Sequence, residues 1–289
     1  MATRRVAVTG ASSPVGDFLL ARLAGEDRSI IAISHDLRRL GLNKEAQKSG
    51  IEWRIVDLRV ALAQEFQADA LLHLAPLWLL PDRIGEFAER GVRRIVALGS
   101  TSAYTKKDSP IPAELAMAKS LEQAEADVAT SCARHAITWT ILRPTLIYAA
   151  GRDANVSAIA AFIRRFGFFP VAAAASGLRA PIHADDVALA CAAALESEAA
   201  ANRSYNIGGG EVLTYRAMVV RVFNGMGKPA RVLRVPAQLM LILSRAAALA
   251  GIPGINAELV RRMNRDQVFD MSDAVRDLKF APRKFRVFF

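Results

Sequence analysis

Short apolar runs that alternate with helix-like stretches constrain the fold of this chain more than any other feature. The runs lie at residues 5–10, 29–34, 52–58, 68–75, 93–100 and 137–144. They are apolar throughout, which is typical of strands that are covered on both faces. Strands that alternate with helices predict an α/β fold, a doubly wound parallel sheet of the Rossmann type with right-handed crossovers.

The pattern loosens beyond residue 150, where helix-like stretches interrupt a second set of strand-like runs. We therefore predict two parts of unequal size. The first is an NAD(P)-binding Rossmann domain at residues 1–150 and 180–210, and the second is a smaller substrate lobe at residues 151–179 and 211–289. The smaller lobe should cover the carboxyl ends of the strands, because ligands of open α/β sheets bind there.

Composition and charge narrow the range of partners. Apolar residues make up 52% of the chain and charged residues 23%, as in ordinary soluble globular proteins. The net charge of +10 favours anionic ligands. Since no basic cluster alternates with aromatic residues, we expect a small anionic substrate and no nucleic-acid partner. A weak contact with a membrane surface and a homodimer stay open.

Two further features bear on the location of the protein. The longest apolar run, residues 239–252, is interrupted by Arg245 and is too short to span a bilayer, so we expect no transmembrane segment. Cys132 and Cys191 lie in apolar helical contexts without the spacing of metal ligands. We therefore expect free thiols, no metal site and a cytoplasmic protein.

A glycine-containing turn follows the first apolar run, in the sequence VTGASSPVGDFLLARL. Gly10 would allow a tight turn, and Gly16 would let the following helix pack close to the sheet. Ser13 stands where a GxxGxxG motif would have its middle glycine. Because free N–H groups at the start of a helix can hold a pyrophosphate, we predict a dinucleotide site here. Its residues are Gly10, Ser12, Ser13, Val15 and Gly16.

The order of motifs along the chain resembles a known family. After the glycine turn come VDL, HLAP, GSTSAY, ILRPTLIY, PIHADDVA and YNIGGG. In this order and spacing, the chain is similar to extended or atypical short-chain dehydrogenase/reductase proteins of the NAD-dependent epimerase/dehydratase type. The likeness covers most of the chain and is thinnest over residues 230–289.

The resemblance implies cofactor contacts beyond the turn. Asp57 would meet the adenine amino group, with Leu58 beside it. Leu74 and Ala75 would lie along the ribose and the pyrophosphate, and Pro144 would also contact the cofactor. A strand-end aspartate with only a structural role is the alternative for Asp57.

The end of the second strand bears on the choice between NADP and NAD. NAD-selective members of the family have an acidic residue there, whereas this chain has Ser34. Ser34, His35 and Arg38 would suit a 2′-phosphate, so we expect NADP to be slightly preferred over NAD. A solvated helix start is the alternative for Arg38, and the nearby Asp36 weighs against a phosphate.

The catalytic unit of the family is only partly present. It consists of a Ser or Thr after the fifth strand and a YxxxK motif on the next helix, whose tyrosine transfers the proton. The resemblance places Ser100 and Lys119 at the serine and lysine positions, but Leu115 at the tyrosine position. A leucine cannot transfer a proton. Tyr104 or Tyr148 could point toward the same crevice, and structural packing is the alternative for both.

Two residues align with the substrate contacts of the epimerases. Arg179 and Asn155 match an arginine and an asparagine that seat a nucleotide-sugar diphosphate there, with a surface arginine and a helix N-cap as alternatives. His183 and the pair Asp185–Asp186 are expected to brace the junction of the two parts, and His73 to lie in the core.

These features predict an NAD(P)-binding, epimerase/dehydratase-like oxidoreductase that acts on a phosphate-bearing substrate such as a nucleotide sugar. The missing tyrosine keeps a second reading open. That reading is a non-catalytic NAD(P)-binding accessory or sensor protein, similar to the accessory subunit of respiratory complex I that resembles this family.

Overall fold

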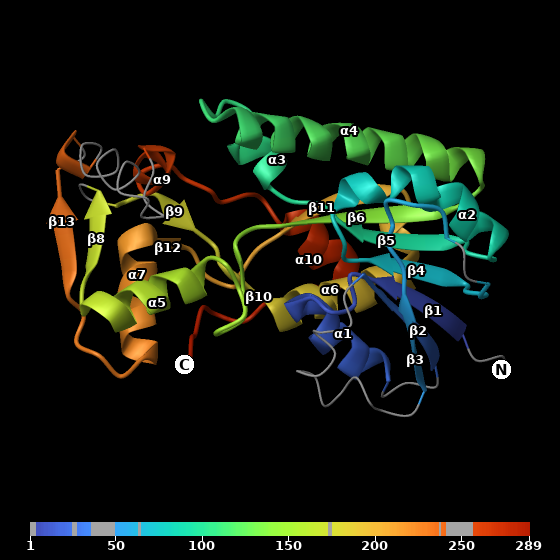
Figure 1. The fold of residues 1–289 in the computed structure, drawn as a ribbon, viewed down its shortest axis with the longest axis horizontal. Coiled ribbons are helices and arrows are strands. Elements are labelled where there is room, and N and C mark those ends of the chain that lie inside the picture. The colour runs from blue at the N-terminus through green and yellow to red at the C-terminus, as the bar shows by residue number, and fades with distance from the viewer. Residues whose placement is uncertain are drawn as a thin grey trace.

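The structure is a computed structural model that describes residues 4–24, 28–35, 50–62, 65–172, 175–236, 238–240 and 257–289 (Figure 1). Its largest element is a sheet of seven parallel strands in the order β11-β6-β5-β4-β1-β2-β3. The strands are β1 (Arg4–Thr9), β2 (Arg28–Ser34), β3 (Ile51–Ile55), β4 (Ala70–His73), β5 (Arg94–Leu98), β6 (Thr138–Pro144) and β11 (Arg203–Ile207). This order confirms the predicted doubly wound α/β fold.

Helices cover both faces of the sheet, as the uninterrupted apolar runs predict. Helices α1 (Pro14–Leu23) and α6 (Ala184–Glu196) lie on one face. Helices α2 (Ile84–Glu89) and α4 (Pro112–Arg134) lie on the other, and the short α3 (Ser102–Thr105) precedes α4. Helix α10 (Ser272–Leu278), from the range assigned to the smaller lobe, packs on β11 and α6.

The side chains of each strand point alternately to the two faces of the sheet and so contribute to two apolar cores. Val8 lies beside Ala32 of β2 and Leu72 of β4, and all three belong to the core under α1 and α6. Their neighbours in sequence point to the opposite face and join Phe87 and Val128 of the second core. Side chains of a strand point alternately to the two faces, so one apolar run fills both cores.

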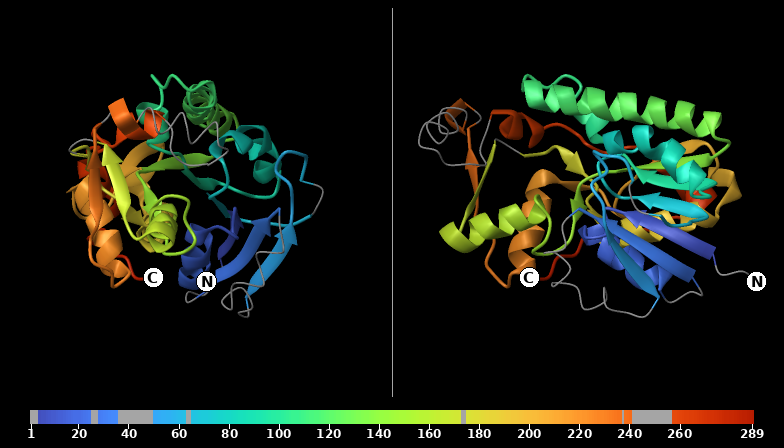
Figure 2. Two further views of the ribbon diagram at one scale, coloured as in Figure 1. Left: turned by 60° about the vertical axis from the view of Figure 1, so that its left-hand side comes forward. Right: turned by 45° about the vertical axis from the view of Figure 1, so that its right-hand side comes forward.

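The smaller lobe lies beyond the carboxyl ends of the strands, on the left in Figure 1 and in both views of Figure 2. Its helices are α5 (Val156–Phe166), α7 (Tyr215–Gly225) and α9 (Ala257–Arg262). Its strands form pairs, namely β7 (Ile147–Tyr148) with β10 (Ile182–His183), β9 (Leu178–Arg179) with β12 (Leu213–Thr214), and β8 (Phe169–Ala172) with β13 (Val232–Val235). Phe285 and Val287, near the C-terminus, complete its apolar core.

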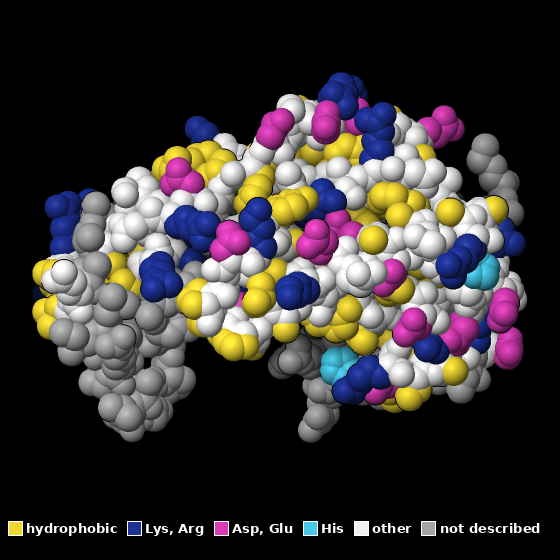
Figure 3. Space-filling model, turned by 90° about the horizontal axis from the view of Figure 1, so that it is seen from above, with side chains coloured by type: hydrophobic (Ala, Val, Ile, Leu, Met, Phe, Trp, Pro, Cys, Tyr) yellow, Lys and Arg dark blue, Asp and Glu magenta, His cyan; other side chains and the backbone are white. Residues whose placement is uncertain are grey.

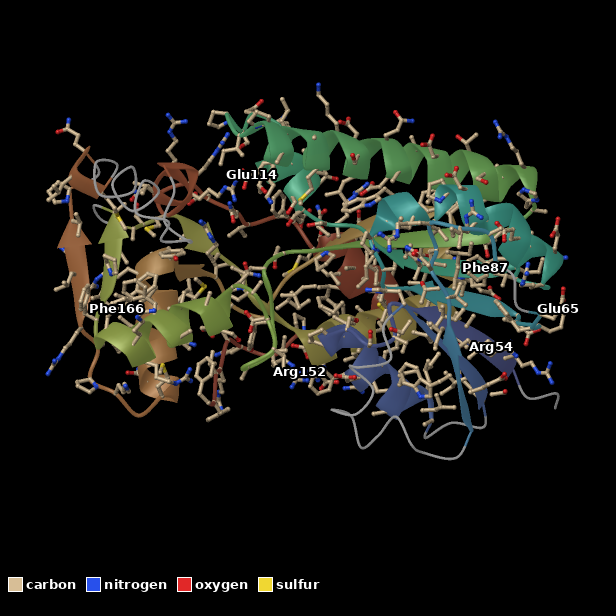
Figure 4. The ribbon with its side chains drawn as sticks, viewed as in Figure 1. Arg54, Glu65, Phe87, Glu114, Arg152 and Phe166 are labelled. Carbon is tan, nitrogen blue, oxygen red and sulfur yellow. The ribbon has the colours of Figure 1, made fainter. Side chains whose placement is uncertain are left out.

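Ion pairs join the two parts on either side of the crevice. Glu114, at the start of α4, pairs with Arg262 of α9. On the other side, Arg152 pairs with Asp17 of α1 (Figure 4). Among the helices that the structure describes, none is both long and apolar enough to cross a membrane.

Candidate functional site

The glycine turn joins β1 to α1 with a geometry that only glycine allows at two positions. Gly10 has a φ of +66°, and a Cβ there would lie 2.6 Å from the Ala75 backbone nitrogen. A Cβ on Gly16 would lie 2.2 Å from the Ala11 carbonyl oxygen. The turn after β1 therefore lies close to the Leu74–Ala75 segment, and a side chain at position 10 would collide with that backbone.

The start of α1 offers fewer hydrogen-bond donors than a helix N-terminus usually does. Pro14 is the first helical residue and has no N–H. Ser13 caps the helix, and its Oγ accepts a hydrogen bond from the Gly16 N–H at 3.1 Å. Val15, in the first turn, has no intrahelical acceptor for its N–H. At the start of α1, the Val15 N–H is thus available to an anion, beside the hydroxyl groups of Ser12 and Ser13.

A cavity of about 330 Å³ opens beside this turn, at the carboxyl ends of β1 to β4. Its walls come from the four strand ends and from the segment that follows β4. The lining residues are Gly10, Ile33, Ser34, His35, Val56, Asp57, Leu58, Arg59, Ala75, Pro76, Trp78 and Leu79. Six of the predicted cofactor residues therefore surround one cavity, and its mixed apolar and polar walls fit the adenosine half of a dinucleotide.

The residues at the end of β2 differ in their surroundings. Ser34 is buried, and its hydroxyl lies 2.9 Å from the Ser12 hydroxyl, so it links β2 to the glycine turn. His35 follows β2 and is exposed at the wall of the cavity. Arg38, the third residue expected at a 2′-phosphate, lies outside the described residues.

Asp57 lies in the cavity wall, but its carboxylate already has a partner. Arg59 donates from Nε to Asp57 Oδ1 at 2.9 Å and from Nη2 to Oδ2 at 2.8 Å. These hydrogen bonds lower the pKa of Asp57, so the carboxylate is charged. An adenine amino group would have to share this carboxylate with Arg59. Arg59 itself, with 70% of its side chain exposed, adds a cation to the mouth of the cavity.

His73 links the end of β1 to the segment that follows β4. It is fully buried at the end of β4, with Nδ1 2.8 Å from Thr9 Oγ1 and Nε2 3.2 Å from the Pro76 carbonyl oxygen. Burial lowers its pKa to about 4, so the ring is neutral near pH 7. A neutral ring donates to Pro76 and accepts from Thr9, and it thereby ties β1 to the segment after β4.

Ser100 and Pro144 meet where β5 and β6 end. The Ser100 Oγ accepts a hydrogen bond from the Ser102 N–H at 3.1 Å, which leaves its own proton available to a ligand. The Pro144 carbonyl accepts from both the N–H and the hydroxyl of Thr101. The end of β6 therefore fixes the turn that carries Ser100.

Tyr104 lies on α3 at the junction of the two parts. Its ring packs on Phe269, with the centroids 5.7 Å apart, and the Arg143 guanidinium carbon lies 5.5 Å from its centroid. Partial burial raises the pKa of the Tyr104 phenol, and Arg143 opposes this effect. The side chain is 40% exposed and open to a ligand, although its pKa makes it a slow proton donor.

Helix α4 presents Leu115 and Lys119 one turn apart on one face, because residues four apart on a helix are neighbours. Leu115 is half-buried, whereas Lys119 is exposed and has no ion-pair partner among the residues that the structure describes. The lysine is therefore available to a ligand. The Leu115 side chain cannot transfer a proton.

Tyr148 and His183 serve packing at the junction. Tyr148 is 1% exposed and lies edge-on to His183 and Phe285, with centroid distances of 5.1 and 4.8 Å. The His183 Nδ1 accepts from the Asp185 N–H and so caps α6. Both roles agree with the structural alternatives drawn from the sequence.

The two predicted substrate residues have contrasting surroundings. Arg179 is 3% exposed and donates to the carbonyl groups of Leu178, Arg262 and Arg265. Its guanidinium therefore ties β9 to the end of α9. Asn155 is exposed at the start of α5 and is open to a ligand, but its side chain does not cap that helix.

Sequence reasoning did not single out several residues of this region. Asp153 binds the start of α5, since its carboxylate accepts from the N–H groups of Ala149, Asn155 and Ser157. Arg59 and Trp78 line the cavity. A basic residue two positions after Asp57 was a visible signal for Arg59. Trp78 gave none, because its exposure depends on how the chain turns after β4.

Comparison with known proteins agrees with this geometry. Residues 78–208 match the model of the NAD dependent epimerase/dehydratase family, a range that contains Ser100, Lys119 and Arg179. A protein of Sinorhizobium fredii, uncharacterized protein y4nG, is 24% identical over 207 residues, which cover 69% of this chain and 52% of the relative. The chain thus spans about half the length of that relative.

Solved structures of 4-epimerases share the fold. UDP-glucuronic acid 4-epimerase from Bacillus cereus, in complex with NAD, is 15% identical and superposes with a TM-score of 0.71 over 96% of this chain and 93% of that chain. UDP-glucose 4-epimerase from Thermotoga maritima, with UDP-glucose, is 15% identical with a TM-score of 0.68 over the same shares. The resemblance stated from the motifs is confirmed: this chain has the Rossmann fold of these enzymes, and residues 78–208 match the model of the NAD dependent epimerase/dehydratase family.

Proposed function

We propose that the protein is an NAD(P)-dependent oxidoreductase of the epimerase/dehydratase type that acts on a phosphate-bearing substrate such as a nucleotide sugar. The observation that carries the proposal is the cavity at the ends of β1 to β4, together with the glycine turn where Gly10 leaves no room for a side chain. Solved relatives hold NAD and UDP-sugars on the same fold.

Different residues of the cavity would contact different parts of the cofactor. Asp57 and Leu58 would meet the adenine, while Ser34 and His35 would lie at its ribose. The Val15 N–H and the Ser12 and Ser13 hydroxyl groups would hold the pyrophosphate. NADP is slightly preferred over NAD, because β2 ends at Ser34 instead of an acidic residue and because Arg59, which pairs with Asp57, is exposed at the mouth.

The nicotinamide ring of a bound cofactor supplies the hydride acceptor. Of the residues in this chain, Lys119 would hold the nicotinamide ribose, and the Ser100 hydroxyl would donate to the substrate oxygen. Tyr104 would exchange the proton, and the burial that raises its pKa would make it a weaker acid. Asn155, exposed at the start of α5, would seat a substrate phosphate.

Two observations favour a second function. Leu115 at the tyrosine position removes the acid/base of the family mechanism, and Arg179 is buried and donates to three backbone carbonyl groups. A non-catalytic NAD(P)-binding accessory or sensor protein needs neither residue. A measurement of hydride exchange on nucleotide sugars distinguishes the two functions.

The deciding experiment measures hydride exchange on a panel of nucleotide sugars with the wild-type protein and two variants. Leu115→Tyr restores the missing phenol, so turnover should rise by about 10²–10⁴-fold, the usual contribution of general acid–base catalysis. Lys119→Ala should weaken cofactor binding in the otherwise unchanged protein. No turnover in either the wild-type protein or Leu115→Tyr, with cofactor binding intact, would favour the non-catalytic function.

A further inference from the structure

The positive charge of the chain is concentrated in the smaller lobe. Residues 154–182, 212–257 and 278–289 contain 13 Lys and Arg and no Asp or Glu. Because the whole chain has 38 Lys and Arg and 28 Asp and Glu, the remaining residues have 25 and 28. The net charge of +10 therefore arises in these segments, which contribute α5, α7, β8, β13 and the C-terminal residues.

Basic and large apolar side chains lie together at the far end of this lobe. Helix α5 ends with Arg164, Arg165 and Phe166. Strand β13 contains Leu233, and Arg231 directly precedes the strand. We call these five residues the basic tip. Figure 4 labels Phe166 at this end, and the left-hand end of Figure 3 shows Lys, Arg and hydrophobic side chains side by side.

Backbone and ring contacts hold the basic tip together. The Phe169 N–H donates to the Arg231 carbonyl at 3.0 Å, and Leu233 pairs in register with Pro170 of β8. The Phe166 ring lies 6.3 Å from that of Phe168, and the Arg165 guanidinium carbon lies 5.2 Å from the Phe166 centroid. Helix α5 and the edge of the β8–β13 pair thus form one surface.

The side chains of the basic tip are exposed to solvent. Phe166 and Leu233 are each 49% exposed, although both are large and apolar. Arg164, Arg165 and Arg231 are exposed, and none has an acidic partner among the described residues. Exposed apolar side chains within a basic rim mark an interaction site rather than a solvated surface.

We propose that the basic tip docks on a bilayer that contains anionic phospholipids. The arginines would lie at the headgroup phosphates, while Phe166 and Leu233 enter the interface, as in basic and apolar surfaces that bind membranes peripherally. Nucleic acid is the weaker fit, because its binding surfaces are polar and would leave both apolar side chains unused. The proposal concerns a different surface from the cofactor cavity and does not depend on the proposed activity.

Vesicle sedimentation tests the proposal with one charge-reversal variant and its matched control. The full protein should bind vesicles of phosphatidylcholine with phosphatidylserine, should release them at high salt, and should leave pure phosphatidylcholine vesicles unbound. Arg164→Glu should weaken binding by roughly 30-fold, since each unit of charge near an anionic bilayer contributes about 1 kcal/mol and the reversal changes two units. Arg134→Glu reverses an exposed arginine in the last turn of α4, on the Rossmann domain, and should leave binding unchanged.

A second variant separates the apolar contribution. Phe166→Ser should weaken binding to the anionic vesicles, whereas Val275→Ser, at an exposed apolar position on α10, should not. Failure to bind anionic vesicles, equal binding to neutral ones, or an equal effect of Arg134→Glu would overturn the proposal. Salt-sensitive binding of a DNA duplex that Arg164→Glu abolishes, without vesicle binding, would assign the surface to nucleic acid instead.

Discussion

At the scale of single residues, Gly10 is the position where the cofactor site depends most on the backbone. Gly10→Ala combines left-handed strain of about 1–2 kcal/mol with a Cβ placed 2.6 Å from the Ala75 nitrogen. Gly151 also has a positive φ, +79°, but a Cβ there meets nothing within 4 Å. We expect Gly10→Ala to lower the free energy of unfolding clearly more than Gly151→Ala in urea denaturation. Equal losses would mean that the turn can shift away from Ala75.

His73 makes stability depend on pH in a defined range. Its folded pKa is about 4 and its ordinary value 6.5, so the unfolded state binds more protons between these values. The free energy of unfolding should therefore be highest above pH 6.5 and should fall, by up to about 3 kcal/mol, as the pH drops toward 4. His183, whose pKa burial also lowers, adds to the same slope.

The matched measurement compares two histidine variants by urea denaturation at several pH values. His73→Asn removes the buried ring and should flatten the slope, whatever it does to absolute stability. His135→Asn, at an exposed position after α4, should keep the slope of the wild-type protein. A wild-type slope retained in His73→Asn would show that other groups cause the loss of stability at acid pH.

At the scale of elements, α5 shows how a helix start can be held from outside the helix. Asp153 accepts from the Asn155 N–H at 2.8 Å and from the Ser157 N–H at 3.1 Å, whereas Asn155 makes no side-chain cap. Asp153→Ala should therefore cost about 1 kcal/mol of stability and Asn155→Ala less than about half of that. Thermal unfolding of the two variants checks the order, and a larger loss in Asn155→Ala would contradict it.

The strands were predictable because each one fills two cores. Residues 29–34 and 137–144 were expected as strands, and β2 (Arg28–Ser34) and β6 (Thr138–Pro144) are observed there. The helix-like stretch expected between the runs 93–100 and 137–144 contains α4 (Pro112–Arg134). Strand pairs such as β8 with β13 were not predicted. Their runs are short, and they pair segments about sixty residues apart.

The cavity was predictable in its main residues, because the carboxyl ends of parallel strands converge at one edge of the sheet. Gly10, Ser34, Asp57 and Ala75 line it as expected. The surroundings of individual side chains were not predictable. The pairing of Asp57 with Arg59 and the burial of Arg179 depend on tertiary contacts that no motif specifies.

At the scale of the whole molecule, the two parts differ in net charge but are joined by ion pairs. Positive charge gathers in the smaller lobe, yet ion pairs cross the junction at Glu114–Arg262 and at Asp17–Arg152. An anionic substrate approaching the crevice would therefore meet a field set mainly by the smaller lobe. This arrangement is consistent with one part for the cofactor and one for phosphate-bearing partners.

The most direct test of the account is calorimetric titration of the wild-type protein with NADP⁺, NADPH, NAD⁺ and NADH, with Gly10→Ala as the control. The cavity and the glycine turn predict binding in the micromolar range, about −8 kcal/mol, which Gly10→Ala should weaken strongly. NADP⁺ and NADPH should bind more tightly than NAD⁺ and NADH, because Ser34, His35 and Arg59 line the cavity where the 2′-phosphate is expected. The absence of binding to all four dinucleotides would show that this crevice is not a dinucleotide site.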